Sequence, residues 1–261
     1  MQLVVDVGNT ETVVGVVEGA SQLRGHWRIS TKVPRTEDEF GYLLRGLLGE
    51  AGFGRERLTR AVVGSVVPAT TAVLRPTLEG LVHGPVFVVD PGVSLPVRLE
   101  VDEPRTVGAD RIVNTLAARA FFHRDTVVVD LGTATTFDCI TWDGVFVGGV
   151  IAPGVSAGLE WLAARTAKLP SVEFAPPGSV VGRRTETCIQ SGIFYGVVDA
   201  LDGMVHRIRS EWERPDALVV ATGGYAALVG THCRTVERVE PWLTLYGLAL
   251  AGFHLSGEAV P

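Results

Sequence analysis

Two short loops carry residue types that can hold a phosphate group. The first is Asp6-Val7-Gly8-Asn9-Thr10 and the second is Asp130-Leu131-Gly132-Thr133-Ala134-Thr135-Thr136; each has Asp-x-Gly with a threonine close behind. Glycine lets backbone N–H groups approach phosphate oxygens, threonine adds a hydroxyl donor, and aspartate can hold a cation that offsets phosphate charge. Either loop alone could be an ordinary glycine-containing turn. Two copies, separated by half of the 261-residue chain, indicate instead two related halves that face one nucleotide.

The residues around each loop predict a β-hairpin with the loop at its turn. Apolar runs at 3–5 and 13–17 flank the first loop, and runs at 126–129 and 137–141 flank the second. Two apolar runs joined by a short glycine-containing segment are typical of a hairpin. We therefore expect Asp6 and Asp130 each to lie at the end of the first strand of a hairpin.

The hydrophobic pattern predicts a mixed α/β protein whose two halves share an order of elements. Beyond the hairpins, strands are expected at 25–30, 60–67, 86–89, 145–151 and 217–221. Helices are expected at 36–49, 70–81, 109–122, after Gly154, at 185–212 and at 243–255. The helix at 109–122 joins the halves, and no stretch rich in Pro, Gly and Ser separates them. We therefore expect domains at 1–123 and 124–261 with a tight hinge, the last helix being able to pack on the first domain.

Composition argues against several classes of protein. The chain is 46% hydrophobic and 20% charged with a net charge of −6, which is typical of a globular protein and unfavourable for binding nucleic acid. The first residues lack the basic region of a signal peptide, and the apolar stretch at 243–255 is too short to span a bilayer. We therefore expect a cytoplasmic protein with no membrane partner. Cys139, Cys188 and Cys233 lack Cys-x-x-Cys spacing and are expected to be reduced thiols.

Four further segments could contribute chemistry, and the most informative is Gly108-Ala-Asp-Arg-Ile-Val-Asn at the start of the joining helix. Asp110 could simply cap that helix, because a helix N-terminus favours a carboxylate. Alternatively, Arg111 could bind a substrate carboxylate while Asp110 orients or deprotonates a hydroxyl. The other three segments are junctions at 148–154, 182–185 and 221–225, each of which could be an ordinary turn. The last follows a buried strand and is expected to open a helix after Gly224, a position where adenosine or phosphate groups commonly bind.

Taken together, these motifs resemble the type III pantothenate kinase family. The set is Asp6-x-Gly-Asn-Thr, Gly108-Ala-Asp-Arg, Asp130-x-Gly-Thr-Ala-Thr-Thr, Gly148-Gly-x-Ile-x-Pro-Gly, Thr185 before Gln190-Ser-Gly-Ile, and Thr222-Gly-Gly. The motifs follow the family's order over nearly the whole chain. The Gly108 motif between the two loops is the most diagnostic part.

The resemblance implies a fold, a reaction and partners. The fold would be α/β, with two ribonuclease-H-like (actin-like ATPase) domains, mixed sheets flanked by helices, and a nucleotide cleft between the domains. The reaction would transfer the ATP γ-phosphoryl group to the primary hydroxyl of pantothenate, the first step of coenzyme A biosynthesis. Mg²⁺ and a monovalent cation, K⁺ or NH₄⁺, would be required. A homodimer would bind pantothenate near its subunit interface.

Carried over position by position, the resemblance also implies residue roles. Asp110 would be the general base, Asp130 would hold the monovalent cation, and Asp6 would serve Mg²⁺ and phosphate. The implied pantothenate contacts are Gly108, Ala109, Asp110, Arg111 and Thr185. The implied ATP contacts are Asp6, Val7, Gly8, Asn9, Thr10, Glu11, Thr12, Val13, Thr133, Gly223 and Gly224.

The chain departs from the family's pattern in two places that bear on pantothenate affinity and selectivity. Residues 91–107 contain no aromatic residue, whereas many relatives place a tyrosine against pantothenate just before the Gly-Ala-Asp-Arg motif. In addition, Gly182-Arg183-Arg184-Thr185 replaces the common Gly-Lys-Asn-Thr. An arginine is not equivalent to lysine or asparagine in a polar pocket, because its planar guanidinium has a different shape and donor geometry.

Three other readings of the sequence remain open. An acetate or sugar kinase of the same superfamily would share the Asp-x-Gly loops but not Gly108-Ala-Asp-Arg. A nucleotide-binding regulator without kinase activity would share the fold, although Asp6, Asp110 and Asp130 are all present. A purely structural two-domain protein would explain neither the repeated loop nor the acidic residues.

Overall fold

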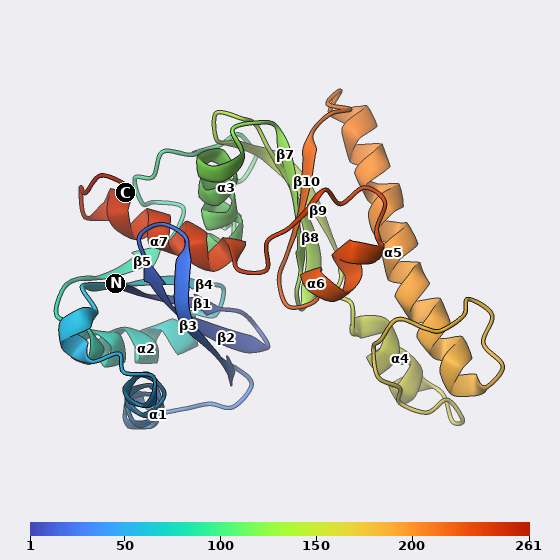
Figure 1. The fold of residues 1–261 in the computed structure, drawn as a ribbon, viewed down its shortest axis with the longest axis horizontal. Coiled ribbons are helices and arrows are strands. Elements are labelled where there is room, and N and C mark those ends of the chain that lie inside the picture. The colour runs from blue at the N-terminus through green and yellow to red at the C-terminus, as the bar shows by residue number, and fades with distance from the viewer. The chain divides into compact units, whose positions relative to one another are not determined.

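The computed structural model describes residues 1–261 and divides them into two compact units, each built on a β-sheet (Figure 1). Unit 1 contains residues 1–121, 144–146 and 243–261. Unit 2 contains residues 122–143 and 147–242. Unit 1 is therefore discontinuous in sequence, because the last helix of the chain belongs with the first strands.

The helices and strands follow the predicted order closely. The elements up to the joining helix are β1 (Gln2–Val7), β2 (Glu11–Glu18), β3 (Gln22–Ser30), α1 (Glu37–Glu50), β4 (Arg60–Ser65), α2 (Pro68–Leu81), β5 (Val86–Val89), β6 (Arg98–Leu99) and α3 (Ala109–Phe122). The later elements are β7 (Thr126–Leu131), β8 (Ala134–Ile140), β9 (Val145–Pro153), α4 (Ala157–Arg165), α5 (Thr185–Glu211), β10 (Leu218–Thr222), α6 (Ala226–Val229), β11 (Arg238–Val239) and α7 (Leu243–Leu255).

Both sheets are mixed, and they place their hairpins in the same way. The first has the strand order β3-β2-β1-β4-β5, and the second has the order β11-β10-β7-β8-β9-β6. β1 pairs antiparallel with β2 and parallel with β4, whereas β7 pairs antiparallel with β8 and parallel with β10. Both predicted hairpins are therefore confirmed, and β4 and β10 occupy corresponding places beside them.

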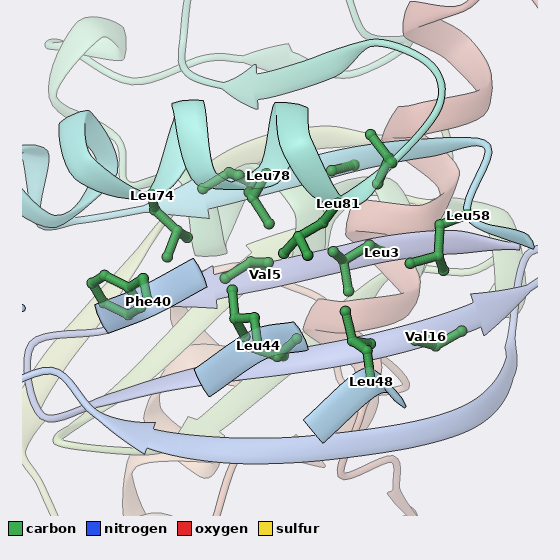
Figure 2. Packing of buried hydrophobic residues seen from close by; sticks show 14 of the residues in the cluster. Leu3, Val5, Val16, Phe40, Leu44, Leu48, Leu58, Leu74, Leu78 and Leu81 are labelled. Carbon is green, nitrogen blue, oxygen red and sulfur yellow. The ribbon is translucent and has the colours of Figure 1, made fainter. Parts of the chain in front are cut away.

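The core of unit 1 forms where helices α1 and α2 cover one face of the first sheet (Figure 2). Leu3 and Val5 of β1 both point to this face, because successive side chains of a β-strand point to opposite faces of the sheet. The helices supply side chains at helical spacing, which are Phe40, Leu44 and Leu48 from α1 and Leu74, Leu78 and Leu81 from α2. Burial of each such side chain stabilises the fold by about 1.5–3 kcal/mol.

The start of α1 shows how the local sequence fixes a helix end. The hydroxyl of Thr36 accepts a hydrogen bond from the Glu39 N–H at 3.3 Å, and the Glu39 carboxylate accepts one from the Thr36 N–H at 2.7 Å. This reciprocal capping box satisfies backbone N–H groups that the helix itself leaves unpaired. The hydrogen bond from the Thr36 backbone lowers the pKa of Glu39. The helix therefore begins where the sequence predicts.

The last helix, α7, packs against β1 and β4 on the face opposite to α1 and α2. The amide of Gln2 donates a hydrogen bond to the Ala249 carbonyl oxygen at 3.1 Å. A second buried bond runs from the Thr244 hydroxyl to Asn114 Oδ1 at 3.0 Å, which ties α7 to α3. A Cβ atom added at Gly247 would lie 2.2 Å from the Val113 carbonyl oxygen, so the two helices touch at this glycine.

Several element boundaries and short elements differ from the predictions. The helix expected from residue 70 begins at Pro68, because proline suits the first helical position, where no N–H is needed. The strand expected to reach residue 67 ends at Ser65. The two-residue strands β6 and β11 were not predicted, and the helix expected after Gly224 is only the four-residue α6. No helix is both long and apolar enough to cross a membrane.

Candidate functional site

The first Asp-x-Gly loop connects β1 to β2 in a closed turn. The Gly8 N–H donates a hydrogen bond to the Glu11 carbonyl oxygen at 3.0 Å, and the Thr31 N–H donates to the Thr10 carbonyl oxygen at 2.9 Å. A Cβ atom at Gly8 would lie 3.1 Å from the same Glu11 oxygen, which leaves little room for a side chain. Asn9 at the tip is exposed and Asp6 is half-buried. The loop is therefore fixed at its base and open at its tip.

Asp6 lies on the face of the first sheet that is opposite to the helical core. Leu3 and Val5 face α1 and α2, so Asp6 points to the other face, and its register partner Gly64 on β4 shares that face. A Cβ atom at Gly64 would be 3.6 Å from Ala109 Cβ, at the start of α3. Likewise, a Cβ atom at Gly108 would be 3.4 Å from Val66. The Gly108 motif and the first loop therefore meet at the carboxyl ends of β1 and β4.

Asp110 is half-buried in the first turn of α3. Its Oδ1 atom accepts a hydrogen bond from the Arg111 N–H at 2.9 Å, which partly fulfils the helix-capping role considered from the sequence. The other oxygen, Oδ2, takes no part in this bond. The capping role and a chemical role are therefore compatible, because they use different oxygens of one carboxylate.

The guanidinium of Arg111 packs on an aromatic ring that the sequence did not identify as part of the site. Its guanidinium carbon lies 4.7 Å from the centroid of Phe146, a buried residue of β9 that belongs to unit 1. A guanidinium over a ring face gains a cation–π attraction and loses rotational freedom. Phe146 is far from Arg111 in sequence, so the sequence predicts only that Phe146 belongs to an apolar strand and not that it contacts Arg111.

The second Asp-x-Gly loop is also closed by a hydrogen bond from its glycine N–H, but the acceptor lies two residues along the chain rather than three. The Gly132 N–H donates to the Ala134 carbonyl oxygen at 3.1 Å, and Thr133 at the tip is exposed. Two glycines from other motifs pack directly on this loop. A Cβ atom at Gly154 would lie 2.0 Å from the Thr133 carbonyl oxygen, and one at Gly223 would lie 2.3 Å from Asp130 Oδ1. The structure thus brings three predicted segments together within unit 2.

The Thr222-Gly223-Gly224 segment begins where β10 ends. Gly223 has a φ of +89°, a conformation that favours glycine, and Gly224 is exposed. The sequence predicts a helix N-terminus here, but α6 has only four residues, so the segment is a tight turn rather than the start of a long helix. Thr222 is fully buried, and its Oγ1 atom has no hydrogen-bond partner. Thr222 belongs to the Thr222-Gly-Gly motif, but the sequence predicts no role for its side chain.

The start of α5 forms a separate polar pocket in unit 2. Thr185 is the first residue of the helix; it is exposed and makes no side-chain hydrogen bond within the protein. The cap comes instead from Thr187, whose hydroxyl oxygen accepts hydrogen bonds from the N–H groups of Arg183 and Arg184, both at 3.2 Å. A cavity of about 250 Å³ lies beside them and is lined by Pro177, Gly178, Ser179, Arg183, Arg184, Thr187 and Gln190.

The acidic residues of the two loops fit some cations better than others. The chain contains no cluster of three or more His, Cys, Asp or Glu side chains that could enclose a metal ion. A magnesium ion at Asp6 would therefore need phosphate oxygens and water to complete its octahedral shell, as is usual for Mg²⁺ at phosphate sites. A monovalent cation needs only one carboxylate for charge balance, and Asp130 supplies one.

The cysteines lie outside these loops and are free thiols, as predicted. Cys139 is buried, Cys188 is exposed, and Cys233 is half-buried. Burial raises the pKa of Cys233 to about 12, and the nearby carboxylates of Asp202 and Asp199 act in the same direction. A thiol with such a pKa is a poor nucleophile at neutral pH.

Comparison with known proteins adds a family and a fold. The family model described as type III pantothenate kinase matches residues 2–207. A type III pantothenate kinase from Syntrophotalea carbinolica is 46% identical over 96% of this chain and 97% of the relative. One from Acidothermus cellulolyticus is 45% identical over 96% of this chain and 97% of the relative.

Among solved structures, the chain resembles a ROK family glucokinase from Streptomyces griseus in complex with glucose and AMPPNP, with a TM-score of 0.55 and 15% identity. The match covers 95% of this chain and 97% of that chain. Component A of (R)-2-hydroxyglutaryl-CoA dehydratase from Acidaminococcus fermentans gives a TM-score of 0.55 at 14% identity, over 98% of this chain and 99% of that chain. The predicted fold class, with two mixed sheets flanked by helices, is confirmed.

Proposed function

The chain belongs to the type III pantothenate kinase family and phosphorylates pantothenate with ATP in coenzyme A biosynthesis, and we propose that Asp110 is the general base of this reaction. The observation that carries the assignment is the contact between the Gly108 motif and the end of β4, beside Asp6. A carboxylate with one oxygen engaged in a helix cap and the other able to accept a proton suits this role.

The acceptor half of the reaction follows from the residues of α3. The Asp110 carboxylate accepts the proton of the primary hydroxyl while the hydroxyl oxygen forms a bond to the γ-phosphorus of ATP. The bond between that phosphorus and the bridging oxygen breaks, and ADP leaves with the bonding electrons. Arg111, steadied by Phe146, binds the pantothenate carboxylate in two-pronged fashion, and Thr185 is a further pantothenate contact.

The donor half uses the two loops. Residues 6–13, Thr133, Gly223 and Gly224 bind ATP, with backbone N–H groups of the loop tips directed at phosphate oxygens. Asp6 would hold Mg²⁺ and Asp130 would hold K⁺ or NH₄⁺, and each cation would offset negative charge on the phosphates. Phosphoryl transfer depends mainly on such positioning and charge neutralisation. The closing hydrogen bond at the base of each loop fixes its conformation, which supports a phosphate-binding role for both loops.

The direct test is ADP release measured with and without pantothenate, in K⁺, NH₄⁺, Na⁺ or choline salts at one ionic strength. We expect ADP release that requires pantothenate and increases strongly with K⁺ or NH₄⁺ relative to choline. Product analysis should identify 4′-phosphopantothenate. ATP hydrolysis that is indifferent to pantothenate would contradict the acceptor assignment. No ADP release with any cation would favour the nucleotide-binding regulator.

We further propose that a second copy of the chain packs on α5. An apolar cavity of about 300 Å³ lies in unit 2 between α5 and the segments around β8, β9 and α4. Gly192, Gly196 and Ala200 repeat every four residues along the α5 side of this cavity, which lets another helix approach closely. Ile151 and Trp161 are 67% and 61% exposed in the same unit. Large exposed apolar side chains of this kind are typical of subunit contacts.

Replacing Gly196 with glutamate is expected to convert the dimer to a monomer, because a charged side chain would then stand in the apolar contact. Sedimentation velocity at several protein concentrations measures the result. The matched control is Gly46→Glu, which changes an exposed glycine of α1 that has open space around it. A wild-type protein that sediments as a monomer, or a Gly196 variant that remains dimeric, would contradict this interface.

A further inference from the structure

The two Asp-x-Gly loops differ in the residue that stands beside the aspartate. In unit 1 the register partner of Asp6 on the parallel strand β4 is Gly64, which has no side chain, and Ala109 occupies the space next to it. In unit 2 the register partner of Asp130 on the parallel strand β10 is Thr222. The repeated architecture thus places a hydroxyl beside one aspartate and none beside the other.

The Thr222 side chain shares a sheet face with Asp130. Val219 and Ala221 of β10 belong to the core beneath α5, so Thr222 points to the opposite face. Val127, Val129 and Leu131 of β7 face the same core, so Asp130 also points away from it. Because register partners on adjacent strands are neighbours, the side chains of Thr222 and Asp130 lie side by side.

The Thr222 hydroxyl is buried but has no hydrogen-bond partner. The residue is 0% exposed, and Oγ1 is one of the few buried side-chain polar atoms that remain unsatisfied. Burying a hydroxyl without a hydrogen bond opposes folding, so such a group calls for an explanation, and a bound ion is one that fits a hydroxyl beside a carboxylate. Asp130 Oδ1 lies against Gly223, the residue after Thr222, and the carboxylate therefore faces this corner.

We propose that the Thr222 hydroxyl oxygen is a ligand of the monovalent cation held by Asp130; this inference rests on the cation role proposed above for Asp130. Neutral hydroxyl and carbonyl oxygens suit K⁺, and one carboxylate balances its charge. A divalent ion would favour additional carboxylates, and no acidic cluster is present. Thr222 is thus a positioning residue for the cation. Gly64, which occupies the corresponding place beside Asp6, has no side chain that could act as a ligand, so the first loop lacks an equivalent cation site.

The test compares Thr222→Val with Thr222→Ser, because valine replaces the hydroxyl with a methyl group of similar size, whereas serine keeps the hydroxyl and loses the methyl group. The melting temperature is measured with ADP and Mg²⁺ while KCl replaces choline chloride at constant ionic strength. We expect the valine variant to need at least about tenfold more K⁺ for half-maximal stabilisation, as expected for the loss of one ligand. In choline alone it should melt at or above the wild-type temperature, because an unpaired buried hydroxyl has been removed. The serine variant should retain the wild-type K⁺ response.

Other outcomes separate the inference from the function on which it rests. An unchanged K⁺ response in Thr222→Val, together with a lost response in Asp130→Asn, would overturn the role of Thr222 alone. A wild-type protein whose melting temperature and ADP release are both indifferent to K⁺ would overturn the cation role of Asp130 and the inference together. Destabilisation of Thr222→Val in choline, with the K⁺ response intact, would identify Thr222 as a structural residue only.

Discussion

Replacing Asp110 with asparagine is expected to lower kcat about 10²–10⁴-fold, the usual contribution of a positioned general base. The amide keeps an oxygen that can accept the hydrogen bond from the Arg111 N–H, so the first turn of α3 should remain formed. It cannot accept the hydroxyl proton. Steady-state ADP release measures the loss, while calorimetric titration with ATP should show an affinity near that of the wild type.

The matched control for this variant is Asp38→Asn. Asp38 is an exposed carboxylate in the first turn of α1, so it has the same favourable position at a helix N-terminus without any predicted chemistry. Its replacement should change kcat by less than about twofold and stability by about 0.5 kcal/mol or less. If Asp110→Asn turned over pantothenate at a rate close to that of Asp38→Asn, another group would have to be the base.

Replacing Gly154 with alanine is expected to damage the second loop without touching its sequence. The added Cβ atom would lie 2.0 Å from the Thr133 carbonyl oxygen and 2.8 Å from that of Gly132. Both are backbone atoms, so the loop must move. A misplacement of about 1 Å can reduce catalysis about 10²-fold, and overpacking of this kind costs about 1–3 kcal/mol of stability. We expect both effects in ATP-dependent kinetics and in chemical unfolding.

The control for Gly154→Ala is Gly203→Ala, in the same unit. Gly203 is an exposed glycine of α5, and no atom lies within 4 Å of an added Cβ. Alanine should be neutral or stabilising there, by up to about 1 kcal/mol, because it favours the helix. Wild-type kinetics for Gly154→Ala would mean that the second loop can shift to accommodate the methyl group. The close contact between Gly154 and the Thr133 carbonyl oxygen would then not be needed for activity.

Local signals explain how much of the fold could be predicted. The capping box at Thr36 and Glu39 marks the start of α1, and the proposed bounds of α3 and α7 agree with the structure. The short strands β6 and β11 could not be predicted, because two-residue strands exist only through pairing with distant partners. The same holds for the end of α6, where Gly230 packs against Ala221 and Val239 and begins a 3-10 turn, Gly230–His232, in place of a further α-helical turn.

The candidate site shows the same limit of prediction. Asp110, Arg111 and the glycines could be predicted as site residues from the residue types and the order of the motifs. Their neighbours were not visible, because Phe146 reaches Arg111 and Thr222 reaches Asp130 only through strand pairing. An ordinary phenylalanine or threonine in a strand has no local pattern that distinguishes a supporting role from simple packing. Such residues need the register of the sheet before they can be recognised.

The discontinuous make-up of unit 1 has a consequence for biosynthesis. On the ribosome, β1 and β4 emerge well before α7, which covers one face of both strands. The hydrogen bond from Gln2 to Ala249 joins two residues that are 247 positions apart in the chain. Until α7 emerges, that face of the first sheet remains uncovered, and such surfaces promote aggregation. The strands that are made first are therefore the last to be completed, and premature termination would leave them exposed.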